Sequence, residues 1–224
     1  RQDLRYGENP HQSAAFYRTP TALASCVAWA DQLNGQPLSY NNLLDLEAAL
    51  EIVRDFSEPT CSIIKHNNPC GLSTHVDLGQ SFLDALDCDR VSAFGSIVGF
   101  NREVDLNTAN LLREEAKSGI KIEAIIAPSF TSEALKQLSR VKTRRILATG
   151  ELTHGESTLQ IRNITDGVLV QSRDSHDLSR IDLQMVTSRN PTEDEMRSLL
   201  FSWKACKHVK SNAILLAQGT KTVG

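Results

Sequence analysis

The chain has 224 residues, of which 40% are hydrophobic and 23% are charged, and its formal net charge is −3. This length and apolar content suit one large domain, or one and a half smaller ones, with a buried core. The slightly acidic balance argues against nucleic acid as the main partner, because phosphate binding needs clustered positive charge. No apolar stretch approaches the roughly 20 residues of a membrane-spanning helix. We therefore expect neither a nucleic-acid partner nor a membrane partner.

Apolar spacing predicts an alternation of strands and helices along the chain. In chain order, we expect a loop at Leu4–Tyr17, a helix at Leu43–Phe56 capped by Asn41 or Asn42, a strand at Cys61–Ile64, a helix at Leu78–Leu86, an apolar run at Val91–Phe100, a helix at Asn107–Lys117, a strand at Ala124–Ala127, a helix at Thr131–Leu138, and strands at Arg145–Ala148 and Gly167–Gln171. The strands are short and continuously apolar, which indicates burial on both faces. This pattern predicts a mainly parallel or mixed α/β sheet covered by helices.

The residues from 189 onward read as the start of a second unit. Arg189–Pro191 is a break, and Thr192–Glu195 is a capping box. The helix that follows places five residues on one stripe: Met196, Leu199, Leu200, Trp203 and Cys206. Ala213–Ala217 then reads as a strand. We therefore expect a first subdomain at 1–188 and the beginning of a second, truncated one at 189–224.

The chain begins without a methionine and stops soon after a predicted strand. A terminal strand without its covering elements exposes apolar surface and an unpaired edge. We therefore expect a piece of something longer. The five cysteines are odd in number and scattered, which suits reduced thiols in a cytoplasmic protein.

The strand at Cys61–Ile64 ends abruptly in Lys65 and His66, and Asn68–Pro69 with Gly71 reads as the turn that ends it. Ligands of open α/β sheets bind just beyond the carboxyl ends of strands. This pair is therefore a candidate catalytic site. It offers a proton carrier near neutral pH and a positive charge for a developing anion. The alternative is that the pair merely begins a solvated loop.

Five further positions are candidate binding residues. The planar fork of Arg5 suits carboxylate or phosphate and the ring of Tyr6 suits stacking, with a polar terminal loop as the alternative. Gly95 interrupts an apolar run, as where backbone approaches a ligand closely; a bulge is the alternative. Glu123 precedes a buried strand and Asn212 follows a basic helix end. Alone, these two would be an ordinary strand end and a helix cap.

A zinc nucleobase deaminase carries His-x-Glu followed by Pro-Cys-x-x-Cys. Here Pro69–Cys70 is followed by Ser73 where the second cysteine should stand, and His154–Glu156 lies downstream, in the wrong order. We therefore expect no zinc site. The sequence also has no Gly-rich phosphate loop of the P-loop or dinucleotide type.

Six segments occur in one order along the chain: Leu4–Gln12, Leu38–Asn42, Lys65–Gly71, Ser92–Gly95, Glu123–Pro128 and Lys210–Ala213. Together they resemble the transformylase part of the AICAR transformylase/IMP cyclohydrolase family, and the resemblance runs from Arg1 to Gly224. It implies a cytidine-deaminase-like three-layer α/β/α sheet with the start of a second similar subdomain. Nothing in the chain resembles the family's cyclohydrolase domain.

The resemblance implies formyl transfer from the co-substrate 10-formyltetrahydrofolate to the 5-amino group of AICAR ribonucleotide, giving FAICAR late in purine (IMP) biosynthesis. His66 matches the family's proton acceptor, and Lys65 matches the cation that stabilises the oxyanion. The residues that match nucleotide contacts are Arg5, Tyr6, Gly95, Glu123 and Asn212. The family sometimes carries Asp at the position of Glu123, and the glutamate side chain is longer.

The family also forms a homodimer with a shared active site, so Arg5 and Tyr6 are expected to serve the partner's site. Its transformylase domain continues past Gly224 into the segment that supplies folate contacts. We therefore expect this piece to be inactive alone. The alternative function is a zinc-free, deaminase-like nucleotide-binding module without turnover.

Overall fold

The protein is described by a computed structural model that covers residues 1–21, 25–153, 159–175, 178 and 183–224. Its centre is an eight-stranded sheet with the strands in the order β11 (Ala217–Gln218), β12 (Lys221–Thr222), β5 (Asn68–Thr74), β4 (Thr60–Lys65), β6 (Ser96–Phe100), β7 (Ile122–Ala127), β8 (Arg145–Ala148) and β3 (Asp31–Asn34). β6, β7 and β8 are parallel, whereas β4 runs antiparallel to both β5 and β6. The predicted mixed α/β sheet is confirmed.

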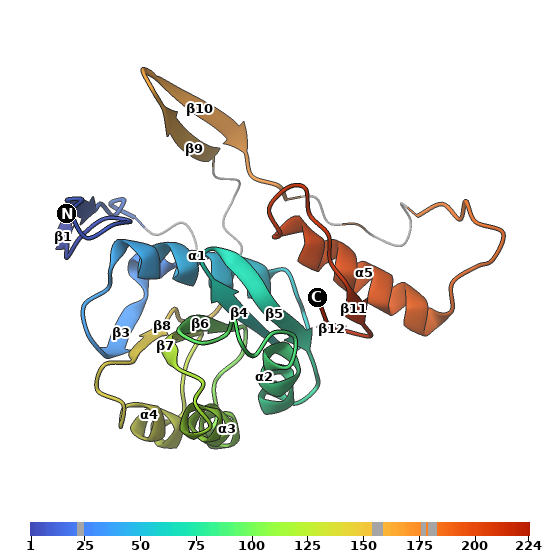
Figure 1. Ribbon diagram of the computed structural model, residues 1–224, viewed down its shortest axis with the longest axis horizontal. Helices are drawn as coiled ribbons and strands as arrows, with labels where there is room; N and C mark the ends of the chain where they lie inside the picture. The colour runs from blue at the N-terminus through green and yellow to red at the C-terminus, as the bar shows by residue number, and fades with distance from the viewer. Residues whose placement is uncertain (22–24, 154–158, 176–177, 179–182) are drawn as a thin grey trace.

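Helices cover both faces of this sheet (Figure 1). One cluster of buried side chains joins the sheet to α2 (Leu78–Leu86), α3 (Leu106–Lys117) and α4 (Ser132–Leu138). A second cluster, on the other face, joins it to α1 (Tyr40–Arg54) and α5 (Glu193–Lys207). Successive residues of β4 alternate between the two, with Ile63 in the first and Ile64 in the second. The expected burial on both faces is confirmed for β4, β6 and β7.

The two long helices on the second face begin at capping boxes. In α1 the N-cap is Ser39, whose hydroxyl accepts from the backbone of Asn42 at 3.2 Å, while the Asn42 side chain accepts from the backbone of Ser39 at 3.1 Å. The predicted cap at Asn41 or Asn42 is therefore wrong: Asn42 is the returning member of the box. In α5 the predicted box of Thr192 and Glu195 is confirmed.

Two small hairpins lie outside the main sheet: β1 (Gln2–Leu4) with β2 (Ala14–Phe16), and β9 (Leu159–Ile164) with β10 (Gly167–Ser172). A single 3-10 turn, η1 (Val27–Trp29), precedes β3. The strand predicted at Gly167–Gln171 exists, but its expected burial is wrong: among the described residues β10 pairs with β9 alone, and it is largely exposed. Across the described ranges, every helix is too short or too polar to cross a membrane.

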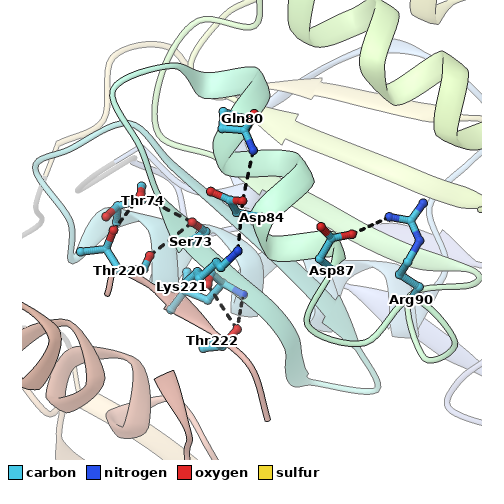
Figure 2. Close-up of polar contacts among 10 residues, drawn as sticks. Ser73, Thr74, Gln80, Asp84, Asp87, Arg90, Thr220, Lys221 and Thr222 are labelled. Carbon is cyan, nitrogen blue, oxygen red and sulfur yellow. Dashed lines mark hydrogen bonds and ion pairs between the residues drawn. The ribbon is translucent and has the colours of Figure 1, made fainter. Parts of the chain in front are cut away.

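The end of the chain extends the sheet beyond β5 (Figure 2). The backbone N–H of Leu72 donates to the hydroxyl of Thr222 at 2.9 Å, and Lys221 Nζ lies 3.4 Å from Asp84 Oδ1 on α2. The strand predicted at Ala213–Ala217 is mostly irregular chain and reaches the sheet only as β11. The subdomain boundary after residue 188 stays a prediction.

α5 is fastened to the end of α1 by an aromatic contact and an ion pair. The rings of Phe56 and Phe201 are 5.6 Å apart, centroid to centroid. Asp55 Oδ2 lies 2.7 Å from His208 Nε2 and 2.6 Å from Lys207 Nζ. Burial alone would raise the pKa of Asp55, but the hydrogen bonds from His208 and Lys207 outweigh it and hold that pKa below its ordinary 3.8.

A carboxyl whose pKa is lowered by folding stabilises the fold above its unfolded pKa, and this stabilisation is lost as the pH falls through the folded pKa. We predict that Asp55→Asn lowers the free energy of unfolding at pH 7 by about 1–2 kcal/mol. The difference from wild type should shrink as the pH falls below 3.8. Urea unfolding at several pH values measures both effects. The control is Asp194→Asn, whose exposed pair with Arg197 at 3.5 Å should contribute at most about 0.5 kcal/mol. If the two variants lost equal free energy of unfolding, the stabilising role of the Asp55 contacts would be contradicted.

Candidate active site

The candidate site is built on the turn between β4 and β5. His66 and Asn67 form this turn with φ values of 53° and 60°, both left-handed. Consecutive left-handed residues suit a tight hairpin because their twist matches that of the strands. The turn predicted at Asn68–Pro69 with Gly71 is wrong, since these residues belong to β5. Gly71 is instead required by the close approach of α2: a Cβ there would lie 2.0 Å from the backbone oxygen of Ala85.

Lys65 is the last residue of β4 and is half-buried, whereas His66 is exposed. The Lys65 ammonium donates to the backbone oxygen of Phe94 at 2.7 Å. Gly95 follows with a φ of +77°, and a Cβ there would lie 2.9 Å from Lys65 Nζ. The structure therefore brings Lys65 and Gly95 together, and it supplies a physical reason for a glycine at this position.

Two more candidate groups lie at the same edge of the sheet. Because β4 is antiparallel to β6, its carboxyl end meets the amino ends of β6, β7 and β8. Glu123 is at the start of β7 and is paired with Lys121 at 2.7 Å. Arg145 opens β8 and donates from Nε and Nη2 to the backbone oxygen of Pro37, both at 3.1 Å. Sequence reasoning missed Arg145 as a site residue. The one signal in the sequence was that a basic residue begins a buried strand.

The N-terminal loop lies at this edge too. The guanidinium of Arg5 is 5.5 Å from the ring centroid of Tyr6. Burial lowers the pKa of Arg145; Glu123 opposes this effect, the charge of Arg5 adds to it, and Tyr6 opposes it, so all three side chains are within electrostatic reach of Arg145. The side chain of Asn41 on α1 fastens the loop by donating to the backbone oxygen of Glu8 at 3.2 Å.

Asn212 is the one predicted site residue that the structure does not connect to the others. Its side chain is exposed, and its Oδ1 accepts from the hydroxyl of Ser211 at 3.0 Å. Within the described ranges, no hydrogen bond or ion pair joins it to Lys65 or His66.

A cavity of about 250 Å³ lies beside β5, and its wall includes Cys70, Cys88 and Asp89. Burial and then the charge of Asp89 raise the pKa of Cys70 to about 12, so this thiol is protonated at neutral pH and is a poor nucleophile. The described residues contain no group of three or more His, Cys, Asp or Glu placed to hold a metal ion. The deaminase-like pair His154 and Glu156 lies outside the described residues.

These positions define a class of site. A lysine and a histidine stand at one edge of an α/β sheet, and two arginines lie close by. Such a set suits proton transfer on an anionic ligand with stabilisation of a developing negative charge.

Comparison with known proteins places the chain in a family. A family model described as the AICARFT/IMPCHase bienzyme matches residues 1–224, and the chain belongs to this family. Relatives named "Bifunctional purine biosynthesis protein PurH" are 45% identical in Oceanobacillus iheyensis, 45% in Bacillus cereus and 46% in Halalkalibacterium halodurans. Each match covers 100% of this chain but 43% of the relative, so the chain spans less than half the relatives' length.

The contact between Gly95 and Lys65 leads to a prediction. Gly95→Ala and Gly119→Ala both place a side chain at a left-handed φ, and each should cost about 1 kcal/mol of stability. Only the first puts a methyl group against Lys65 Nζ, because nothing lies within 4 Å of a Cβ at Gly119. We expect crystal structures to show the Lys65 ammonium displaced from the Phe94 oxygen in Gly95→Ala alone. An unchanged 2.7 Å contact in that variant would contradict the account.

Proposed function

We propose that the edge of the sheet at Lys65 and His66 is the formyl-transfer site of a purine-biosynthesis enzyme. The reaction moves a formyl group from 10-formyltetrahydrofolate to the 5-amino group of AICAR ribonucleotide and gives FAICAR. The observation that carries the proposal is that Lys65 ends β4 and His66 opens the left-handed turn after it, while the Lys65 ammonium donates to the backbone oxygen of Phe94, just before Gly95. Membership of the AICARFT/IMPCHase family supports it.

The chemistry explains why these two side chains suit the reaction. The amine of AICAR is conjugated with an electron-poor imidazole, so it is a weak nucleophile and must lose a proton as it attacks. In our proposal His66 accepts this proton while the new bond forms between the amine nitrogen and the formyl carbon. General base catalysis of this kind contributes roughly 10²–10⁴-fold in rate.

Lys65 acts on the negative charge that develops on the formyl oxygen. Attack on the formyl carbon produces a tetrahedral oxyanion, and the ammonium of Lys65, a half-buried residue, stabilises it. The intermediate collapses when the bond from the formyl carbon to the folate nitrogen breaks and that nitrogen takes a proton. The existing hydrogen bond to Phe94 holds the cation in place before the charge develops.

The nucleotide is proposed to lie along the same edge. Arg5 and Arg145 supply positive charge for its phosphate, and the ring of Tyr6 offers a stacking surface. In this proposal Arg5 and Tyr6 serve the site of their own chain, whereas the family resemblance implies that they serve the partner's. Gly95 lets backbone approach the ligand, and Glu123 adds a polar contact. Asn212 is proposed as a further polar contact to the nucleotide.

Several parts of the proposal concern more than this chain. We propose a cytoplasmic homodimer with shared active sites, folate contacts from the part of the relatives that this chain does not span, and a sheet of the cytidine-deaminase type without zinc. The expectation that this chain alone has little turnover belongs to the same proposal.

A first test removes the cation. We predict that Lys65→Met lowers kcat for formyl transfer by about 10²–10³-fold, the loss typical of an oxyanion stabiliser, in a full-length protein that carries this sequence. The variant should fold normally because Lys65 ends its strand at a partly exposed position. Lys136→Met, at an exposed position of α4, is the matched control and should leave kcat unchanged. Normal turnover in Lys65→Met would sink the oxyanion role.

The second candidate function is a nucleotide-binding module without turnover. It is favoured by one observation: Arg5, Tyr6 and Arg145, the proposed nucleotide contacts, all lie within this chain and at one edge. His66→Ala separates the two functions. For the enzyme we predict a loss of kcat of about 10²–10⁴-fold with AICAR ribonucleotide affinity within about tenfold of wild type. A large loss of affinity in a protein that has no turnover would favour the binding module. Steady-state kinetics and calorimetric titration give the two readouts.

A further inference from the structure

The His66–Asn67 turn has an unusual backbone that needs support. Both residues have left-handed φ values, of 53° and 60°, and neither is glycine. L-residues adopt this region rarely, and such positions persist where surrounding contacts hold them. Since the turn carries His66, whatever holds the turn also sets where the imidazole lies.

The support comes from Asp45 on α1. The backbone N–H of Asn67 donates to Asp45 Oδ1 at 2.7 Å. In the orientation that satisfies its side-chain amide, Asn67 also donates to Asp45 Oδ1 at 3.1 Å and to the backbone oxygen of Leu44 at 3.3 Å. The His66 backbone adds a small effect that lowers the pKa of Asp45, so it lies within electrostatic reach of the same carboxylate. One carboxylate thus binds Asn67 by its backbone and by its side chain.

The carboxylate is also electrostatically coupled to the proposed catalytic pair. Burial raises the pKa of Asp45, while the Asn67 hydrogen bond and the charges of His66 and Lys65 oppose that rise. Asp45 is therefore a partly buried group within electrostatic reach of both side chains. It lies on α1, outside the β4–β5 hairpin.

We propose that Asp45 is a positioning residue for the formyl transfer: it clamps the left-handed His66–Asn67 turn and so presents the His66 imidazole and the Lys65 ammonium to the substrate. This proposal rests on the proposed function of the site. It assigns a role to a residue that makes no contact with the reacting atoms itself.

A purely structural role is the competing explanation, and the sheet argues against it. β4 is paired along its length with β5 on one side and with β6 on the other, so the hairpin has its own ladder without Asp45. Loss of the carboxylate should therefore disturb the turn more than the fold. A displacement of about 1 Å in a catalytic group can cost 10²-fold in rate.

The test uses a full-length protein that carries this sequence, with kcat and KM for AICAR ribonucleotide as readouts. We expect Asp45→Ala to lower kcat by about 10–100-fold and to leave KM within about threefold. Asp45→Asn keeps an acceptor for the Asn67 N–H, so its kcat should fall less than that of Asp45→Ala. Glycine adopts a left-handed φ freely, so Asn67→Gly should restore the turn without the carboxylate. The double variant Asp45→Ala with Asn67→Gly should therefore have a kcat at least fivefold higher than Asp45→Ala alone.

A matched control and a second readout keep the outcomes separate. Asp105→Ala also removes a carboxylate that accepts one backbone N–H, from Thr108 at 2.8 Å, but it lies at the cap of α3 and should lower stability without lowering kcat. Amide hydrogen exchange at Asn67 should accelerate at least tenfold in Asp45→Ala, whether or not the protein turns over.

An inactive wild-type protein would overturn the proposed function, while unchanged exchange at Asn67 would overturn the clamp. An active wild type with unchanged kcat in folded Asp45→Ala, or no recovery with Asn67→Gly, would overturn the positioning role.

Discussion

The antiparallel pairing of β4 with β6 is the constraint on which the placement of the site depends. It turns the carboxyl end of β4 toward the amino ends of β6, β7 and β8. Lys65 therefore meets the loop before β6, and Glu123 and Arg145 lie at the starts of the next two strands. The buried clusters on the two faces fix these strands, so residues far apart in sequence are held at one edge.

Much of the fold could be predicted from local patterns, and the errors have physical causes. The helix at Leu78–Leu86 and the strand at Arg145–Ala148 have the predicted bounds, because their apolar spacing and flanking residues agree. Burial was harder to infer. The strand at Gly167–Ser172 is apolar yet exposed. α5 buries Phe201 and Ala205, whereas the predicted stripe is half-buried at Met196, Leu200 and Cys206 and exposed at Leu199 and Trp203. Periodicity identifies an apolar face but not what covers it.

The candidate site can be predicted in part, where its residues give local signals in the sequence. Lys65 and His66 stood out because they end a buried strand, and Gly95 because it interrupts an apolar run. The turn itself was misplaced, since Pro69 and Gly71 are strong turn signals, whereas His66 and Asn67 are weak ones. Asp45 gave no local signal, because its contact with Asn67 joins a helix to a hairpin through tertiary packing. Contacts of this kind become visible only in three dimensions.

We propose that the edge at Lys65 and His66 binds AICAR ribonucleotide with its 5-amino group ready to react. The decisive experiment is a crystal structure of a full-length protein carrying this sequence with AICAR ribonucleotide bound. We expect the 5-amino nitrogen within about 3.2 Å of a ring nitrogen of His66, or one water away from it, with the phosphate near Arg5. A nucleotide bound elsewhere, or bound with its 5-amino group turned away from His66, would contradict it.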